Sequence, residues 1–216
     1  MKLAALAFLT ALIGSQGASA GDLHSAYGAR GSGEGHGSVA VGGGVYLFNS
    51  GRLGTLPAPV LTLGLSYTSS HLVDLYLDVD GGVLTQGPAG LIFAEAGVAI
   101  RPTPEGSPVA IGLRVAPTAL IGIGKGSLGL MGVAGGLFAG GGNNQVQFSA
   151  MVDFPMFFAL VGDVSGTGFA ASVRPGVVLD VAATDALTVF LRANTLIGLS
   201  GGLGVISVNV TGGVAF

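Results

Sequence analysis

The feature that most constrains this chain is a long alternation of apolar and polar residues that repeats along most of its length. From about Ser38 onward, apolar residues recur at every second position, which is the period of a β-strand and not of a helix. Across residues 73–79, for example, apolar residues at odd positions alternate with Asp74, Tyr76 and Asp78. The pattern therefore predicts strands that each have one apolar and one polar face.

Turn-forming residues divide the alternating region into ten runs. Gly, Pro, Asn and Ser gather at nine breaks, of which Gln86-Gly87-Pro88 and Ser200-Gly201-Gly202 are examples. Most runs are 10–17 residues long. A soluble strand averages about 5–6 residues, whereas a tilted membrane-spanning strand needs about 9–11. The run lengths therefore favour an all-β, antiparallel, up-and-down transmembrane β-barrel of about ten strands, with eight or twelve as alternative counts.

The charged residues of these runs all lie on the polar face. Charged residues make up only 9% of the chain, against about 25% in an ordinary soluble domain, and none within the runs is Lys. A polar face this small and Gly-rich suits a crowded barrel interior better than a surface in water. Because Arg forms bidentate pairs with carboxylates, we expect a paired charge network in the lumen. Its predicted members are Asp74, Asp78, Asp80, Glu95, Arg101, Arg114, Asp153, Arg174, Asp180 and Arg192.

The first 20 residues have the pattern of a secretory signal peptide. Met1-Lys2 is a short basic start, residues 3–13 are apolar, and Ala18-Ser19-Ala20 has the small-x-small form of a cleavage site. Cleavage near Ala20 would leave a flexible, Gly/Ser-rich lead-in at 21–37, followed by the barrel at 38–216.

The C-terminus adds a further signal. The last run alternates through Val208, Val210 and Val214 and ends on Phe216. This ending resembles the C-terminal assembly signal of Gram-negative outer-membrane β-barrels, and the region 38–216 is similar to that class. The resemblance implies an outer-membrane location, contact with outer-membrane lipid, and recognition by the barrel-assembly machinery during biogenesis. The chain departs from the class in having no Trp and short outward loops.

Composition and motifs narrow the possible functions. The formal net charge of −3 leaves no basic surface for nucleic acid, and the absence of Cys excludes thiolate metal sites. We expect no cofactor. His24 and His36 fall in the lead-in and His71 falls at a tight turn, which gives no convincing catalytic constellation. We expect a structural membrane barrel or a narrow, mostly closed pore. An outer-membrane enzyme acting on lipid or peptide, and a secreted Gly-rich structural β-protein, are the alternatives.

One acidic row has two interpretations. Asp74, Asp78 and Asp80 share a face of one predicted strand, and their oxygens could bind a cation. Pairing with the lumen Arg residues is the favoured interpretation, because buried Arg side chains need acids or carbonyls as partners.

Deletion of Phe216 tests the resemblance to the outer-membrane class. An assembly signal acts through recognition in the cell, whereas one terminal aromatic residue adds little to the packing of a barrel of this size. We therefore expect the deletion to lower the amount inserted into cell membranes far more than the yield of refolding into detergent. Equal losses in the two assays would mean that Phe216 is an ordinary structural residue.

Overall fold

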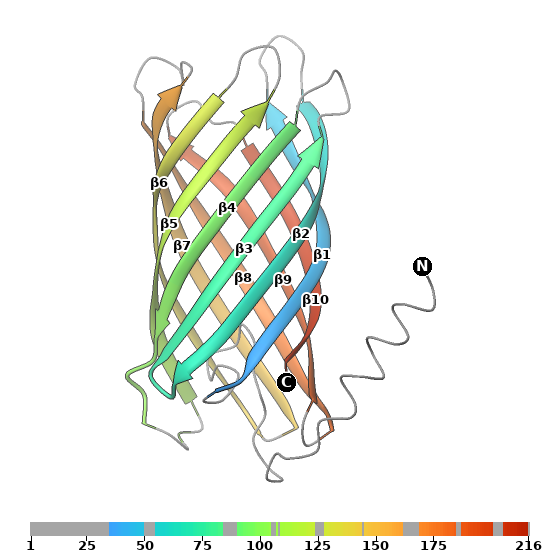
Figure 1. Ribbon diagram of the computed structural model, residues 1–216, viewed down its shortest axis with the longest axis vertical. Helices are drawn as coiled ribbons and strands as arrows, with labels where there is room; N and C mark the ends of the chain where they lie inside the picture. The colour runs from blue at the N-terminus through green and yellow to red at the C-terminus, as the bar shows by residue number, and fades with distance from the viewer. Residues whose placement is uncertain are drawn as a thin grey trace.

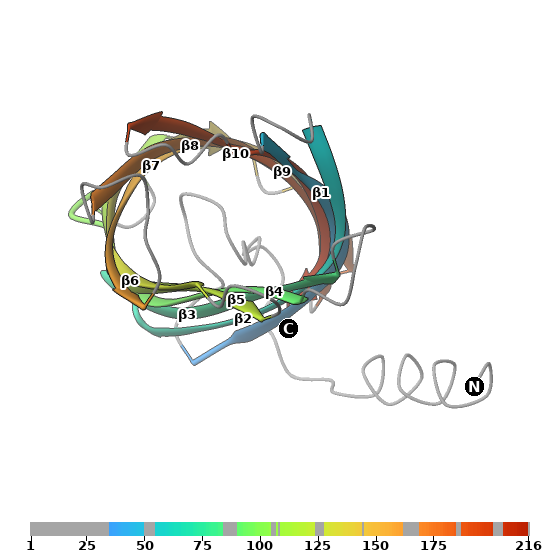
Figure 2. The ribbon, with the colours of Figure 1, turned by 90° about the horizontal axis from the view of Figure 1, so that it is seen from above.

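Each alternating run of the sequence forms one strand, and the ten strands close into a barrel (Figures 1 and 2). The computed structural model describes residues 35–49, 55–83, 90–104, 107, 109–123, 128–143, 145–161, 169–184, 187–200 and 205–215. The strands are β1 (Gly37–Asn49), β2 (Thr55–Ser70), β3 (Val73–Val83), β4 (Gly90–Ile100), β5 (Val109–Ile123), β6 (Leu128–Gly142), β7 (Val146–Val161), β8 (Phe169–Thr184), β9 (Leu187–Ser200) and β10 (Val205–Ala215).

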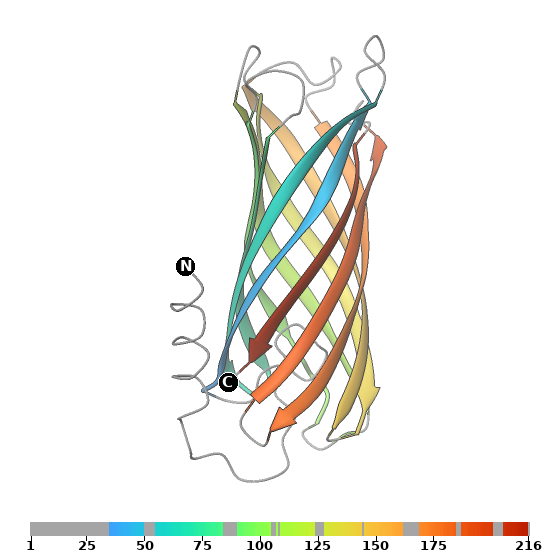
Figure 3. The same ribbon diagram turned by 90° about the vertical axis from the view of Figure 1, so that its right-hand side faces the viewer.

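The ring closes where β1 pairs with β10. Every strand pairs antiparallel with its sequence neighbours, and the closing register runs from Ser38 opposite Ala215 to Phe48 opposite Val205. Figure 3 shows this seam, with β1 lying between β2 and β10. The predicted all-β, up-and-down barrel of ten strands is confirmed, and the architecture agrees with the outer-membrane barrel class that the sequence resembles. Within the described ranges, no helix has the length and apolarity that a membrane crossing requires.

The two ends of the barrel differ. β1 begins and β10 ends at the same end, at the bottom of Figure 1, which we call the terminal end. Three of the four strand connections at this end are only two or three residues long, at 71–72, 143–145 and 185–186. The predicted signal peptide at 1–20, most of the lead-in at 21–37 and Phe216 lie outside the described residues.

The alternation places apolar side chains on the outside of the wall. Leu61 is 65% exposed and Leu77 40% exposed, and the outer faces of the other strands carry similar residues. All ten charged side chains that the structure describes are turned away from this face. The exterior of the described strands is therefore an uncharged apolar surface.

Three prolines coincide with interruptions of the strand pairing. Pairing stops and resumes in the same register between β4 and β5 at Pro117, between β7 and β8 at Pro155, and between β8 and β9 at Pro175. Proline has no N–H group, so it removes one hydrogen bond from the ladder. The last pairs before these gaps include Glu95 and the directly opposed Asp153 and Arg174.

Replacement of Leu77 by Arg tests whether the exterior meets lipid. Leu77 lies in the middle of β3, where a charge in hydrocarbon costs about 2–4 kcal/mol, against about 0–1 kcal/mol near an interface. We expect Leu77→Arg to lower the free energy of unfolding in lipid vesicles by that larger amount. The matched change Tyr67→Arg, on the same face near the terminal end, should cost much less. Equal costs at the two depths would contradict a lipid-facing exterior.

Candidate functional site: a charge belt in the lumen

The ten residues predicted for the lumen network fall into three groups. Asp74 and Arg101 lie near the terminal end, and Asp180 lies on β8 opposite Gln147 of β7. The other seven occupy the middle of the lumen, and we call them the charge belt: Asp78, Asp80, Glu95, Arg114, Asp153, Arg174 and Arg192.

Arg174 is the centre of the charge belt. Its Nη2 donates to Glu95 Oε2 at 2.7 Å and to Asp153 Oδ2 at 2.9 Å. Asp153 is the cross-strand neighbour of Arg174, whereas Glu95 lies on β4, four strands away around the ring. The guanidinium group therefore joins two sides of the barrel through the lumen.

Arg114 completes a four-membered group with the same two acids. Its Nη1 lies 3.4 Å from Asp153 Oδ2, and its Nη2 lies 3.8 Å from Glu95 Oε1. The Arg114 guanidinium also stacks over the Tyr76 ring, 4.1 Å from its centroid, while Tyr76 Oη donates to Glu95 Oε1 at 3.0 Å. Glu95 is only 1% exposed, so its charge is compensated by these neighbours and not by water.

Arg192 forms a second connection through the lumen. Its Nη1 donates to Asp78 Oδ2 at 2.7 Å, from β9 to β3. Asp80, two residues further along β3, differs from Asp78: its Oδ2 accepts hydrogen bonds from Tyr46 Oη at 2.7 Å and Asn209 Nδ2 at 3.1 Å. Among the residues the structure describes, no Arg forms an ion pair with Asp80.

The pair near the terminal end is separate from the belt. Arg101 follows the last residue of β4, Ile100, and so lies just outside the strand in which the alternation placed it. Its guanidinium pairs with Asp74, and its Nη1 donates to the His71 carbonyl at 3.1 Å. Asp74 also accepts a hydrogen bond from Thr68 Oγ1 at 2.5 Å. The Asp74 carboxylate is thus engaged by Arg101 and Thr68.

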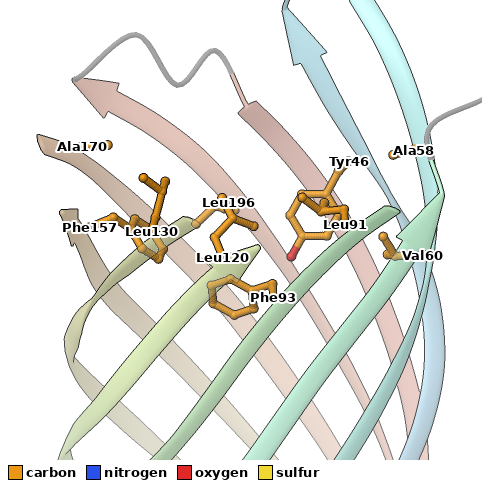
Figure 4. Close-up of a cluster of buried hydrophobic side chains, with 10 residues drawn as sticks. All are labelled: Tyr46, Ala58, Val60, Leu91, Phe93, Leu120, Leu130, Phe157, Ala170 and Leu196. Atoms are coloured by element: carbon orange, nitrogen blue, oxygen red, sulfur yellow. The ribbon is translucent and has the colours of Figure 1, made fainter. Parts of the chain in front are cut away.

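Sequence reasoning missed two apolar layers that lie on either side of the belt. The interior face was expected to be small and polar, but large apolar side chains share its parity. Figure 4 shows the layer nearer the end opposite the termini, where the Phe93 and Phe157 rings meet edge to face with centroids 6.3 Å apart. This layer contains Tyr46, Ala58, Val60, Leu91, Phe93, Leu120, Leu130, Phe157, Ala170 and Leu196.

The second apolar layer lies on the terminal side of the belt. Its members are Ala40, Ala99, Ala110, Phe138, Met151, Val178, Phe190 and Ala215. The sequence signal was present at two positions, because Phe93 alternates in step with Glu95 and Phe190 alternates in step with Arg192. The outward face is even more apolar and dominates the alternation pattern.

A small cavity adjoins the charge belt. A cavity of about 20 Å³ lies among Asp80, Arg174, Arg192 and Asn209, which is room for about one water molecule. The described part of the chain contains no group of three or more His, Cys, Asp or Glu side chains placed to hold a metal ion. The arrangement compensates charge in the middle of the lumen.

No protein-family model matches the sequence, and no curated protein matches it. The translocator domain of autotransporter NalP from Neisseria meningitidis is similar with a TM-score of 0.46 and 11% identity, covering 86% of this chain and 89% of that one. Outer membrane protein OprG from Pseudomonas aeruginosa is similar with a TM-score of 0.28 and 12% identity, covering 85% and 96%.

Proposed function

We propose that the protein is an outer-membrane β-barrel of a Gram-negative bacterium whose lumen is closed by its own side chains. It serves as a structural membrane protein or as a narrow, mostly closed pore. The observation that carries the proposal is the contact of Arg174 with Glu95 and Asp153 through the lumen, with an apolar layer on each side.

The exterior supports insertion into a membrane. The strands are 11–16 residues long, enough for the about 9–11 residues that a tilted crossing needs. Their outer faces form a continuous apolar surface, whereas soluble monomers rarely expose apolar patches larger than a few hundred Å². Closure of the ring satisfies the backbone groups of the strand edges, which is the condition for crossing hydrocarbon with strands.

The interior supports a closed lumen. A ten-strand barrel is barely wider than an eight-strand barrel, whose interior is just filled by side chains. Here the charge belt lies in the middle of the lumen, and a cluster of buried apolar side chains lies on each side of it. Removal of one partner from a buried ion pair costs about 3–5 kcal/mol, so the belt also holds the two sides of the wall together.

Gel mobility and fractionation test the membrane part of the proposal. A closed barrel resists unfolding in detergent, so unheated and boiled samples should migrate differently. In cells the protein should be recovered in the outer-membrane fraction and be released by detergent. Identical migration, together with recovery in the soluble periplasmic fraction, would favour the secreted structural protein instead.

Conductance in planar bilayers tests the closed lumen. We expect little or no steady conductance from the wild-type protein. The double variant Arg114→Ala/Arg174→Ala should conduct and should favour cations, because Glu95 and Asp153 would then remain without their arginines.

A matched control is Arg101→Ala, which removes a buried Arg outside the belt and should leave the barrel silent. A large, steady conductance of the wild-type protein would indicate an open porin instead of a closed barrel. A silent double variant that still inserts as a barrel would mean that these Arg side chains do not block the lumen.

A further inference from the structure

The strand pairing of β8 stops on both of its edges within four consecutive residues. Towards β7 the ladder skips Ser172 and Val173, and towards β9 it skips Arg174 and Pro175. In the strands that the structure describes, β8 is the one with such a stop on both edges, because the other interrupted strands stay paired with their second neighbour. The segment 172–175 is therefore the part of the wall that the backbone ladder holds least.

At the interruption between β8 and β9, the polar groups of β9 are engaged by β10. Leu196 N donates to Ser207 Oγ at 3.1 Å, and Thr195 Oγ1 donates to the Ser207 carbonyl. Among the residues that the structure describes, no side-chain hydrogen bond joins Thr195 or Leu196 to β8. We call this place, residues 174–175 and 195–196, the β8–β9 gap.

Arg174 holds this part of β8 from inside the lumen. Its Nη2 donates to Glu95 Oε2 at 2.7 Å, and its Nε and Nη2 lie 3.3 and 2.9 Å from Asp153 Oδ2. Its Cζ also lies 5.6 Å from the centroid of the Phe93 ring. These contacts tie β8 to β7 and β4, and none of them reaches β9. The side chain of Arg174 therefore supplies, from the lumen, a connection that the backbone ladder lacks at this height.

Apolar side chains lie on both sides of the β8–β9 gap. Outside, Val177 and Ile197 belong to the exposed apolar face of the wall. Inside, Leu196 belongs to a buried apolar layer, and the cavity of about 20 Å³ is lined from both strands, by Arg174 of β8 and by Asn194 and Leu196 of β9. An opening at this place would connect the hydrocarbon of a membrane with the lumen, and its apolar border would admit uncharged apolar molecules.

We propose that the β8–β9 gap is a lateral opening of the barrel wall and that Arg174 is the latch that keeps it shut. When Arg174 releases Glu95 and Asp153, the segment 172–175 has neither a continuous ladder nor its lumen contacts, and it moves away from β9 in a local opening. Uncharged apolar molecules of the bilayer then reach the cavity from the side. The proposal rests on the proposed function, since only a barrel embedded in lipid offers such molecules a lateral path.

Thiol labelling in lipid vesicles tests the proposal, because the chain has no Cys of its own. Leu196→Cys places a single thiol behind the gap, where the wild-type side chain is 6% exposed. The probe is pyrene maleimide, which is uncharged and partitions into the bilayer. We expect Arg174→Ala to raise the labelling rate of Leu196→Cys roughly tenfold or more, because removal of one partner strongly destabilises a buried ion pair.

Two matched controls separate a lateral opening from a general loosening of the barrel. Arg192→Ala removes another arginine of the belt, at a position where β9 is paired with both of its neighbours, and should leave the labelling of Leu196→Cys unchanged. Leu120→Cys places the thiol in the same apolar layer, at a position where β5 is paired with both of its neighbours. It should stay unlabelled when combined with Arg174→Ala.

Equal labelling of Leu196→Cys with and without Arg174 would overturn the proposal. Equal gains at Leu196→Cys and Leu120→Cys would overturn it as well, because they indicate an opening along the barrel axis. If Arg174→Ala does not form a barrel, Glu95→Gln removes a partner of the latch and is measured in its place, with the same gain expected and the absence of a gain again overturning the proposal.

Two further readouts recognise a failed proposed function separately. Heat-dependent gel mobility of the same samples reports the barrel itself. Rapid labelling of Leu196→Cys by a charged, water-soluble maleimide in the presence of Arg174 reports an open, water-filled lumen.

Discussion

The pairing of β1 with β10 is the constraint on which the rest of the structure depends. It closes the ring, leaves no strand edge unpaired, and gives the alternating faces two different surroundings. Because ten strands enclose a narrow space, inward side chains from opposite walls meet and must compensate one another. The contact between Arg174 and Glu95 is a direct consequence, since those residues lie four strands apart around the ring.

The inward side chains are arranged in layers along the lumen. Apolar side chains fill both sides of the middle, and the charged side chains lie between them, where water has little access. In such surroundings an arginine without an acid, or an acid without a cation, is costly. The pairing of Arg114, Arg174 and Arg192 with Asp78, Glu95 and Asp153 follows from this rule.

The wall and the belt are also coupled. Pro117, Pro155 and Pro175 each remove a backbone donor, and the strand pairing is interrupted beside each of them. Glu95, Asp153 and Arg174 stand at the edges of these gaps, and their side chains are joined by short hydrogen bonds. The ion pairs of the belt therefore join the strands at the level where the backbone ladder is incomplete.

The sequence by itself determined the strands, their number and the sorting of faces, because a period of two assigns every residue of a strand to one side of the wall. It also placed Asp78, Glu95 and Arg174 on the inner side. It could not determine which acid meets which arginine, since Arg174 and Glu95 are 79 residues apart and Arg192 and Asp78 are 114 apart. It also could not show that Phe93 and Phe157 meet edge to face inside the lumen. Those contacts depend on the stagger of strands around the closed ring, and only the tertiary structure decided which side chains from opposite walls come to the same height.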